Sequence, residues 1–350
     1  MLFPSKKLLG LDIGTSSLKI AEIEERGKRL TLNRFSVLPI QYGITNSGDI
    51  ADPQSLSSAI STIASMVKSK RKNVATGMWG TSVIVKKITM PLMDERLVAE
   101  QIKWEAEQYI PFDINEVSLE HVILKNRPST GETMDVLLVA AKQEVIFRYI
   151  ESVSGAGLKL ASLDVSAFAL ANCFTSNYGN IAGAVAVIDI GAGVTNLVII
   201  ENGEIIFGRD LSVGGMNYTN DIHRMMGVSI DEAEALKISS SMNQAAPAEL
   251  NTVITSSHEN VLDEIRNSFE FFAATAGNSV VTRVYLTGGS SVVPGLAEGI
   301  TRATALPVER LDVFNKIEIN QKNIPSDFVE QIRTVAAVAI GLGLRKVGDS

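Results

Sequence analysis

Apolar positions along the chain follow two patterns, one typical of strands and one typical of helices. Strand-like apolar runs lie at Val74–Met78, Val83–Met90, Val117–Leu124, Asp135–Ala140 and Val280–Leu286. Helical spacing and capping signals predict helices over Pro53–Lys70, Asp94–Tyr109, Gln143–Gly155, Ser229–Lys237, Asn251–Ala276 and Val335–Leu344. Polar or small-residue stretches at 127–133 and 239–248 predict loops. The alternation of helices and strands predicts an α/β fold throughout.

The strongest organisational feature is an internal repeat. Residues 8–24 read LLGLDIGTSSLKIAEIE, and residues 184–201 read AVAVIDIGAGVTNLVIIE. Each copy is an apolar run that ends in Asp-Ile-Gly, followed by a turn of small residues and a second strand-like run. Asn202-Gly203 after the second copy is a strong two-residue hairpin signal. Two copies of one β-hairpin, half a chain apart, predict two related lobes that share a ligand between them.

Composition and charge exclude several classes of protein. The chain has 350 residues, of which 45% are hydrophobic and 20% charged, as in an ordinary globular protein of about two domains. Its formal charge of −7 gives no support for a nucleic-acid partner. The single cysteine, Cys173, excludes an intrachain disulfide and is interpreted as a small buried residue. We therefore expect a chain of a reducing, cytoplasmic compartment.

No stretch of the sequence predicts a signal peptide or a membrane span. The apolar run Leu8–Leu11 is shorter than the roughly 7–15 residues of a signal-peptide core. The run Val335–Leu344 reaches about half of the roughly 20 residues that a span requires. The polar ending Gly343–Ser350 is too short for an amphipathic membrane helix. If this chain works at a membrane, we expect a partner to hold it there, without direct insertion.

The first Asp-Ile-Gly turn carries residue types that can hold a polyphosphate and its metal. Asp12 ends a buried strand and would hold Mg²⁺ through water. Turn amides and hydroxyls can donate to phosphate oxygens, and a lysine supplies a point charge. The candidate residues are Asp12, Gly14, Thr15, Ser16, Ser17 and Lys19. Such a turn alone is common in plain hairpins, and the second copy shifts the balance toward a ligand site.

Four further elements carry matching chemistry. The second hairpin offers Asp189, Gly191, Gly193, Thr195 and Asn196, with Asp189 as the second candidate for Mg²⁺. Glycine pairs before predicted helices stand at Gly214 and Gly215 and at Gly288 and Gly289, the latter followed by Ser290. Glu234 and Lys237 share one helical face, where they could point at a ligand or form an exposed ion pair.

The order of these five elements, followed by the small-residue helix Val335–Leu344, resembles the actin superfamily from end to end of the chain. That superfamily includes actin, sugar kinases, heat-shock chaperone ATPases and the division protein FtsA. Within it, the stretches IKWEAEQYIPFD at 102–113, MDVLLVAAK at 134–142 and FEFFAATA at 269–276 resemble the FtsA-like PilM family of type IV pilus assembly. These stretches lie outside the nucleotide motifs and therefore discriminate within the superfamily.

The resemblance implies a duplicated, actin-like two-lobe ATPase fold, ribonuclease H-like in each half, that binds ATP or ADP with Mg²⁺. Asp12 and Asp189 would face the metal, while the other candidate residues would hold the phosphates and the nucleoside. Residues 1–80 and 161–183 would form subdomain 1A, and 81–160 an FtsA-type subdomain 1C. Residues 184–218 and 279–350 would form subdomain 2A, and 219–278 subdomain 2B.

One departure from the superfamily concerns hydrolysis. Actin and the chaperone ATPases carry Glu or Gln near the attacking water, whereas the similar stretch here places Val165 there, or Asp164 if the register shifts by one. Without a group that orients water, hydrolysis should be slow. The resemblance therefore implies tight nucleotide binding with little turnover, with Asp164 as the one catalytic candidate.

A peptide partner is also implied by the resemblance. PilM relatives bind the cytoplasmic N-terminus of the membrane protein PilN between 1A and 1C, and through it connect indirectly to PilO and the pilus motor ATPases. Trp104, Tyr109 and Phe112 could border such a groove or be core of 1C. A filament-forming FtsA-like ATPase and a small-molecule kinase are the alternative functions, and the sequence leaves self-association open.

Overall fold

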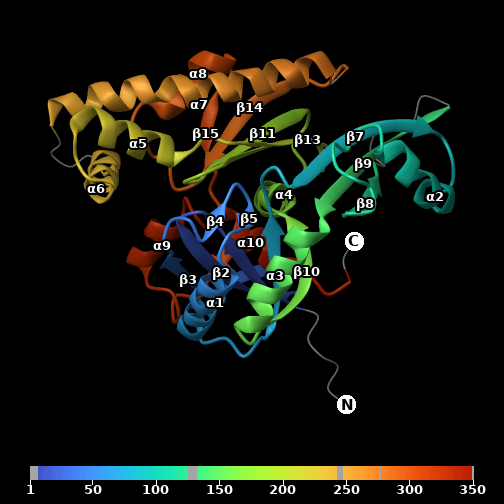
Figure 1. Cartoon of the computed structure of the whole chain (residues 1–350), viewed down its shortest axis with the longest axis horizontal. Helices are drawn as coiled ribbons and strands as arrows, with labels where there is room; N and C mark the ends of the chain where they lie inside the picture. The colour runs from blue at the N-terminus through green and yellow to red at the C-terminus, as the bar shows by residue number, and fades with distance from the viewer. Residues whose placement is uncertain (1–6, 125–131, 243–246, 276, 349–350) are drawn as a thin grey trace.

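The computed structural model describes residues 7–124, 132–242, 247–275 and 277–348. Its two lobes are built on two mixed β-sheets, and each sheet contains one copy of the repeat (Figure 1). Residues 127–131 of the first predicted loop and 243–246 of the second lie outside the described residues. Ser239–Ser241 of the second predicted loop continue a helix instead.

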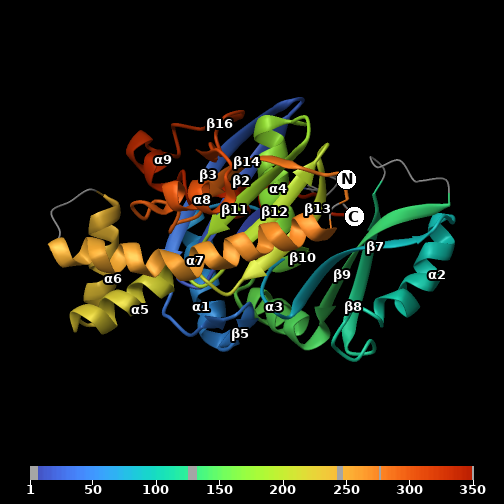
Figure 2. The same cartoon turned by 90° about the horizontal axis from the view of Figure 1, so that it is seen from above.

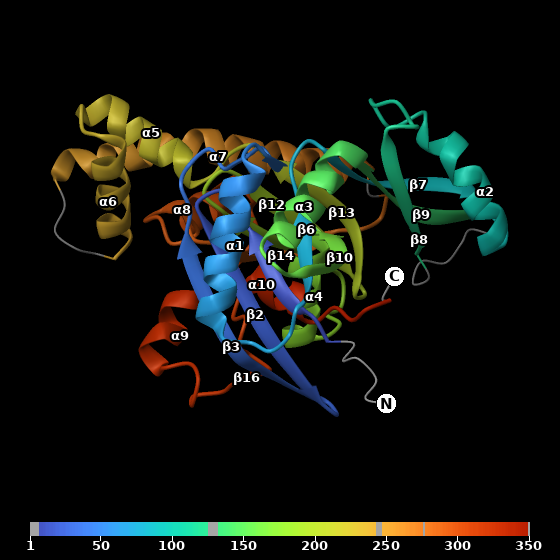
Figure 3. The same ribbon diagram turned by 60° about the horizontal axis from the view of Figure 1, so that its bottom comes forward.

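The first lobe contains a six-stranded sheet in the order β10-β6-β1-β2-β3-β16. The strands are β1 (Leu9–Ile13), β2 (Ser17–Arg26), β3 (Arg29–Pro39), β6 (Asn73–Met78), β10 (Lys159–Val165) and β16 (Ile317–Ile319), with β4 (Thr45–Asn46) and β5 (Asp49–Ile50) as a separate hairpin. Helices α1 (Pro53–Val67) and α3 (Gln143–Gly155) cover one face of the sheet (Figure 3). Helices α4 (Ser166–Tyr178) and α10 (Ala337–Gly343) cover the other face.

The second lobe contains a five-stranded sheet in the order β13-β12-β11-β14-β15. The strands are β11 (Ala184–Ile190), β12 (Thr195–Glu201), β13 (Glu204–Leu211), β14 (Val281–Thr287) and β15 (Val308–Arg310). Helices α5 (Gly215–Met226), α6 (Ile230–Ser241), α7 (Ala248–Thr275) and α8 (Leu296–Thr304) belong to this lobe, and α7 runs along its top (Figures 1 and 2). Apolar side chains of these helices and of the sheet form one buried cluster.

The two copies of the repeat have the same strand register. In the first copy, Asp12 pairs with Lys19 and Ile13 with Leu18 across β1 and β2. In the second copy, Asp189 pairs with Asn196 and Ile190 with Thr195 across β11 and β12. Both strand pairs therefore end one residue beyond the aspartate, and both Asp-Ile-Gly turns project from the ends of their sheets.

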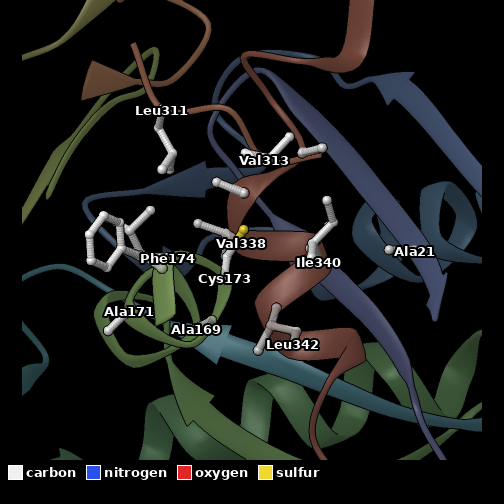
Figure 4. Packing of buried hydrophobic residues seen from close by; sticks show 14 of the residues in the cluster. Ala21, Ala169, Ala171, Cys173, Phe174, Leu311, Val313, Val338, Ile340 and Leu342 are labelled. Carbon is white, nitrogen blue, oxygen red and sulfur yellow. The ribbon is translucent and has the colours of Figure 1, made fainter. Parts of the chain in front are cut away.

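A buried cluster between the sheets joins the lobes through α4 and α10. Cys173 and Phe174 of α4 lie among Val338 and Ile340 of α10 (Figure 4). Val187 of β11 adds a residue of the second sheet to the same cluster. The prediction that Cys173 is a buried small residue is confirmed. Burial raises the pKa of its thiol to about 12, so it stays protonated at neutral pH.

The C-terminal part of the chain returns to the first lobe. Strand β16 pairs in parallel with β3, and α10 packs on β1, while α9 (Ser326–Ile332) lies beside the same lobe (Figure 3). Residues 279–348 are therefore shared between two lobes, whereas the resemblance implies that 279–350 belong to subdomain 2A. The physical reason is the apolar α10, whose side chains are buried against α4 and the first sheet.

A small third sheet stands apart at one end of the molecule (Figure 2). Strands β7 (Val83–Pro91), β9 (Thr133–Lys142) and β8 (Val117–Ile123) form it, and α2 (Glu95–Ala106) packs on it. This unit lies within the stretch 81–160 assigned to 1C, but α3 at the end of that stretch packs on α1 and shares the core of the first lobe. No described helix combines the length and apolar character that crossing a bilayer requires.

Candidate functional site

A cavity of about 540 Å³ lies between the lobes, where the two Asp-Ile-Gly turns face each other. The predicted residues that line it are Asp12, Gly14, Thr15, Ser16, Ser17, Lys19, Asp189, Gly191, Asn196, Glu234, Lys237, Gly288, Gly289 and Ser290. Four of the five sequence elements thus contribute to the cavity lining, and the fifth, Gly214 and Gly215, packs directly behind it. Gly215 packs directly against the side chains of Ser290 and Lys237, so a Cβ there would clash with them.

The turn of the first hairpin is closed by a hydrogen bond from the Gly14 amide to the Ser17 carbonyl oxygen, 3.2 Å. At its base, Lys19 Nζ lies 3.2 Å from Asp12 Oδ2. The hydroxyl of Thr15 is buried and has no hydrogen-bond partner. Because a buried hydroxyl without a partner is costly, this one points to a ligand that would complete it.

The turn of the second hairpin has the same closure, from the Gly191 amide to the Val194 carbonyl oxygen at 2.9 Å. Two other predicted residues of this hairpin have structural roles. Gly193 packs on Thr15, whose Oγ1 would lie 2.7 Å from a Cβ at this position. Thr195 Oγ1 donates to the Val213 carbonyl oxygen at 2.8 Å and so holds the loop that leads to α5.

Asp189 is the carboxylate with the clearest electrostatic signature. Burial, reinforced by the negative charge of Asp12 and opposed by the positive charge of Lys19, raises its pKa to about 7. Two carboxylates that border one cavity and repel each other fit a divalent cation, which would offset both charges. Asp12 and Asp189 therefore fit the Mg²⁺ that accompanies a nucleotide, either directly or through its water ligands.

Lys237 and Glu234 form the polar floor of the cavity on the α6 side. Lys237 Nζ lies 2.6 Å from Glu234 Oε2 and donates to Thr219 Oγ1 at 2.9 Å and to the Gly215 carbonyl oxygen at 3.2 Å. The lysine side chain is buried, whereas the glutamate is partly exposed. The pair is therefore an ion pair with a buried lysine, and both of its residues line the cavity.

Gly288 marks the opposite wall. Its φ of +99° and its contacts with the Ile190 backbone and the Asp189 carboxylate exclude a side chain at this position. The Gly288 amide donates to the Thr334 carbonyl oxygen at 2.8 Å, and the Ser290 amide donates to the Ile190 carbonyl oxygen at 2.9 Å. These two hydrogen bonds hold the backbone that follows β14 against the second hairpin on one side. On the other side they hold it against the segment that precedes α10.

Sequence reasoning missed Ser166, the first residue of α4. Its hydroxyl is buried, borders the cavity and has no hydrogen-bond partner. Gly77 lies directly opposite, where a Cβ would come within 2.7 Å of Ser166 Oγ. A hydroxyl residue where a strand-like run meets a helix was the available signal. The candidates predicted from the sequence at this junction were its neighbours, Asp164 and Val165.

The structure places Asp164 and Val165 outside this cavity. Asp164 Oδ2 lies 3.2 Å from Arg345 Nε, and burial raises its pKa although the charge of Arg345 opposes the shift. Val165 lines a different cavity. At the junction of β10 and α4, it is therefore Ser166 that faces the nucleotide-sized space.

That second cavity, of about 360 Å³, lies where β7, β13 and the end of β10 meet. Its lining includes Val83 and Val85 of β7, Arg209 and Asp210 of β13, and Phe112. We call it the peptide groove below. Of the predicted groove residues, Phe112 is in its lining, under the Lys142 ammonium at 4.5 Å from the ring centre.

The other two predicted groove residues lie elsewhere on the third sheet unit. Tyr109 packs beneath Lys86 Nζ, 4.4 Å from its ring centre. Trp104 on α2 is 73% exposed and is not part of the groove lining. The rings of Tyr109 and Phe112 each have a lysine ammonium group over one face. The ring quadrupole attracts a cation placed there.

Comparison with known proteins decides the family. Residues 10–347 match the family described as type IV pilus assembly protein PilM. The chain belongs to the PilM family. A solved structure titled PilM-PilN type IV pilus biogenesis complex is 29% identical, with a TM-score of 0.87 over 97% of this chain and 98% of that one. The resemblance drawn from the sequence is therefore confirmed.

More distant relatives share sequence or fold with this PilM-family chain. Cell division protein FtsA of Streptococcus pneumoniae is 23% identical over 95% of this chain and 82% of its own length. A structure of MreB5 of Spiroplasma citri bound to AMPPNP is 14% identical, with a TM-score of 0.52 over 95% of this chain and 94% of that one. The predicted actin-like, FtsA-like fold is confirmed.

Proposed function

We propose that this chain binds ATP or ADP with Mg²⁺ between its lobes and docks the cytoplasmic N-terminal segment of PilN. The observation that carries the nucleotide site is the inter-lobe cavity, where two facing Asp-x-Gly turns meet two buried hydroxyls that lack partners. The superfamily supports it, because the related MreB5 structure was solved with AMPPNP.

The residues divide the work of binding. Amides and hydroxyls of the first turn and the amides of the second donate to phosphate oxygens, and Lys19 adds a positive charge beside them. Thr15 and Ser166 gain the hydrogen bonds that they lack in the protein alone. When bound, Mg²⁺ shields the phosphate charge against Asp12 and Asp189. The backbone at Gly288–Ser290 and the pair Glu234–Lys237 hold the nucleoside end.

Hydrolysis in this site is slow. The side chain at the start of α4 is Ser166, and a serine hydroxyl is a poor general base at neutral pH. Asp164, the candidate from the sequence, is held by Arg345 instead. The nucleotide therefore acts as a structural ligand that bridges two lobes and favours the closed arrangement by its differential affinity.

The peptide groove is the proposed docking place for PilN. It is lined by two edge strands, β7 and β13, which leave backbone groups available to an extended peptide. The solved PilM-PilN complex, to which this chain is similar over nearly its whole length, supports PilN as the partner. Docking of this kind would hold the chain at the cytoplasmic face of the inner membrane and connect it indirectly to PilO and the motor ATPases.

Two measurements test this function separately. Purified protein is denatured, and any released nucleotide is identified; then Mg·ATP is titrated into nucleotide-free protein by calorimetry. A labelled synthetic peptide of the PilN N-terminus from the same genome is titrated in parallel. We expect both ligands to bind. Failure of Mg·ATP to bind, or ATP affinity that survives both Asp12→Ala and Asp189→Ala, would contradict the nucleotide site, and failure of the peptide would contradict the partner.

A further inference from the structure

The nucleotide cavity and the peptide groove share a wall. Trp79 and Val194 line both of them. Trp79 is buried, and its indole Nε1 donates to the Ile13 carbonyl oxygen at 2.9 Å, which ties it to the first Asp-x-Gly turn. Val194 belongs to the second turn. Each turn of the nucleotide site therefore reaches the groove through one apolar residue.

A chain of hydrogen bonds crosses this wall. Asn196, in the lining of the nucleotide cavity, donates from Nδ2 to Asp210 Oδ1 at 2.6 Å. Asp210, in the lining of the groove, accepts at Oδ2 from the Gly80 amide at 2.5 Å. Burial raises the pKa of Asp210, and these two bonds oppose the shift. Burial disfavours the charged form of the Asp210 carboxylate, and two hydrogen bonds stabilise it. One comes from Asn196 on the nucleotide-cavity side and the other from the Gly80 amide on the groove side.

Gly80 lies where the chain crosses from the first lobe into the third sheet unit, between β6 and β7. Its φ is +87°, and a Cβ there would clash with the Ser47 carbonyl oxygen in the turn between β4 and β5. The crossing is therefore held between that turn on one side and Asp210 on the other. Since β7 starts three residues later and lines the groove, the position of Gly80 sets the position of β7.

We propose that Asn196, Asp210 and Gly80 couple the two sites, so that a nucleotide held by the second turn fixes β7 and tightens the peptide groove. This inference rests on the proposed function and adds its regulation. Asp210 acts as a positioning residue: when the second Asp-x-Gly turn is held in place by a nucleotide, Asp210 holds the segment around Gly80 in place as well. By linkage, the peptide must raise nucleotide affinity by the same factor as the nucleotide raises peptide affinity.

The first test measures that factor. The affinity of the labelled PilN peptide is determined with and without saturating Mg·ATP, and the affinity of Mg·ATP with and without the peptide. We expect a ratio of about fivefold or more in both directions for the natural sequence. For Asp210→Ala and for Asn196→Ala we expect the ratio to fall within twofold of unity, whatever happens to the separate affinities.

The double variant and a matched control sharpen the result. If both residues act along one chain, the double variant loses no more coupling than either single variant. Asp135→Ala removes a carboxylate on β9 that bonds Lys87 and Thr89 and lines neither cavity, and it should keep the full ratio. A ratio near unity in the natural sequence, or full coupling in Asp210→Ala, would overturn the proposal.

A second measurement needs no variant. Hydrogen exchange of the amides in residues 79–85 is followed with and without Mg·ATP, because the Gly80 amide is itself a member of the chain. We expect Mg·ATP to slow exchange there by about fivefold or more. Protection confined to the Asp-x-Gly turns would overturn the coupling while leaving nucleotide binding intact, so failure of the inference and failure of the proposed function give different results.

Discussion

The two Asp-x-Gly hairpins carry different charge at a matched position seven residues after each aspartate. In the first hairpin this position is Lys19, whose ammonium lies 3.2 Å from Asp12. In the second it is Asn196, which pairs with Asp189 in the strand register but donates its side-chain hydrogen bond to Asp210. One copy therefore pairs its aspartate with a lysine of the same hairpin, while the second copy places no cation at that position, and its aspartate is opposed only by Lys19 of the first copy.

Because of this difference, the two hairpins contribute different groups to the cavity although their backbones are alike. The first turn supplies a positive charge to the phosphates. The second turn supplies an aspartate whose pKa burial has raised and an asparagine that reaches the neighbouring groove. Sequence duplication explains the shared backbone geometry, and the divergence at Lys19 and Asn196 explains why only the second turn is connected to Asp210.

The largest effect on stability is expected from a substitution two residues before the aspartate. At this position β1 has Gly10 and β11 has Val187. Gly10 touches the backbone of Ala339 and Gly343 in α10, so a side chain there would clash with that helix. Val187 is instead fully buried in the core between the lobes. Gly10→Val, which copies the second hairpin into the first, should lower the free energy of unfolding by about 3 kcal/mol or more.

Chemical denaturation measures that change, with Gly208→Ala as the control. Gly208 is also a strand glycine, but a Cβ there would meet only Val85, at an ordinary 3.9 Å. We expect the control to change stability by about 0.5 kcal/mol or less. Equal effects of the two substitutions would mean that α10 does not require the close approach at Gly10.

The next largest effect is on Mg·ATP affinity, from substitutions at Lys19 and at the matched Asn196. Lys19→Ala should weaken Mg·ATP binding by about 10- to 100-fold, because a charge-assisted contact to phosphate is worth about 1.5–3 kcal/mol. Asn196→Ala removes a neutral side chain that is already bonded to Asp210 and should weaken binding by less than about tenfold. Calorimetric titration gives both values, and the reverse ranking would contradict the division of tasks.

A pH series tests the uncompensated aspartate. Because the pKa of Asp189 is raised from 3.8 to about 7, the folded protein without nucleotide binds one more proton than the unfolded chain between these values. Stability contributed by this group is therefore greatest at low pH and falls as pH rises through 7. Asp189→Asn should lose this part of the slope of Tm between pH 5.5 and 8, and parallel curves would show that the aspartate titrates normally.

The smallest effect compares one threonine from each hairpin. Thr195→Val removes a bond to the Val213 carbonyl oxygen and should cost about 1 kcal/mol of stability. Thr15→Val removes a buried hydroxyl that has no partner, so it should leave stability unchanged or slightly higher while weakening Mg·ATP binding. Loss of stability in Thr15→Val would indicate that this hydroxyl is bonded within the protein.

Sequence patterns predicted the repeat and most of the elements, because hairpins and capped helices are encoded by local residues. Asp52, Asp94 and Ser229 each accept a backbone hydrogen bond at the helix starts that the sequence predicted. The return of β16 and α10 to the first lobe was not predicted, since it depends on packing between residues at opposite ends of the chain. The packing of α3 on the first lobe was not predicted either, because its apolar side chains could equally have packed on the third sheet.

The candidate site was predicted to a similar extent and for the same reason. Turn glycines and strand-end aspartates have local signatures, so 14 of the predicted residues line the cavity. Ser166 has a weaker signature, a hydroxyl at the start of a helix, because its role follows from the junction of β10 and α4 facing the cavity. The link from Asn196 to Asp210 depends on the register of β12 and β13, which the residues alone do not reveal.

The most direct test of the two-hairpin site is a crystal structure of this chain with Mg²⁺ and a non-hydrolysable ATP analogue. The account predicts the phosphates between the two Asp-Ile-Gly turns, with Lys19 and the hydroxyls of Thr15 and Ser166 in contact with them and the metal between Asp12 and Asp189. Phosphates bound to only one turn, or a nucleotide outside the inter-lobe cavity, would contradict it.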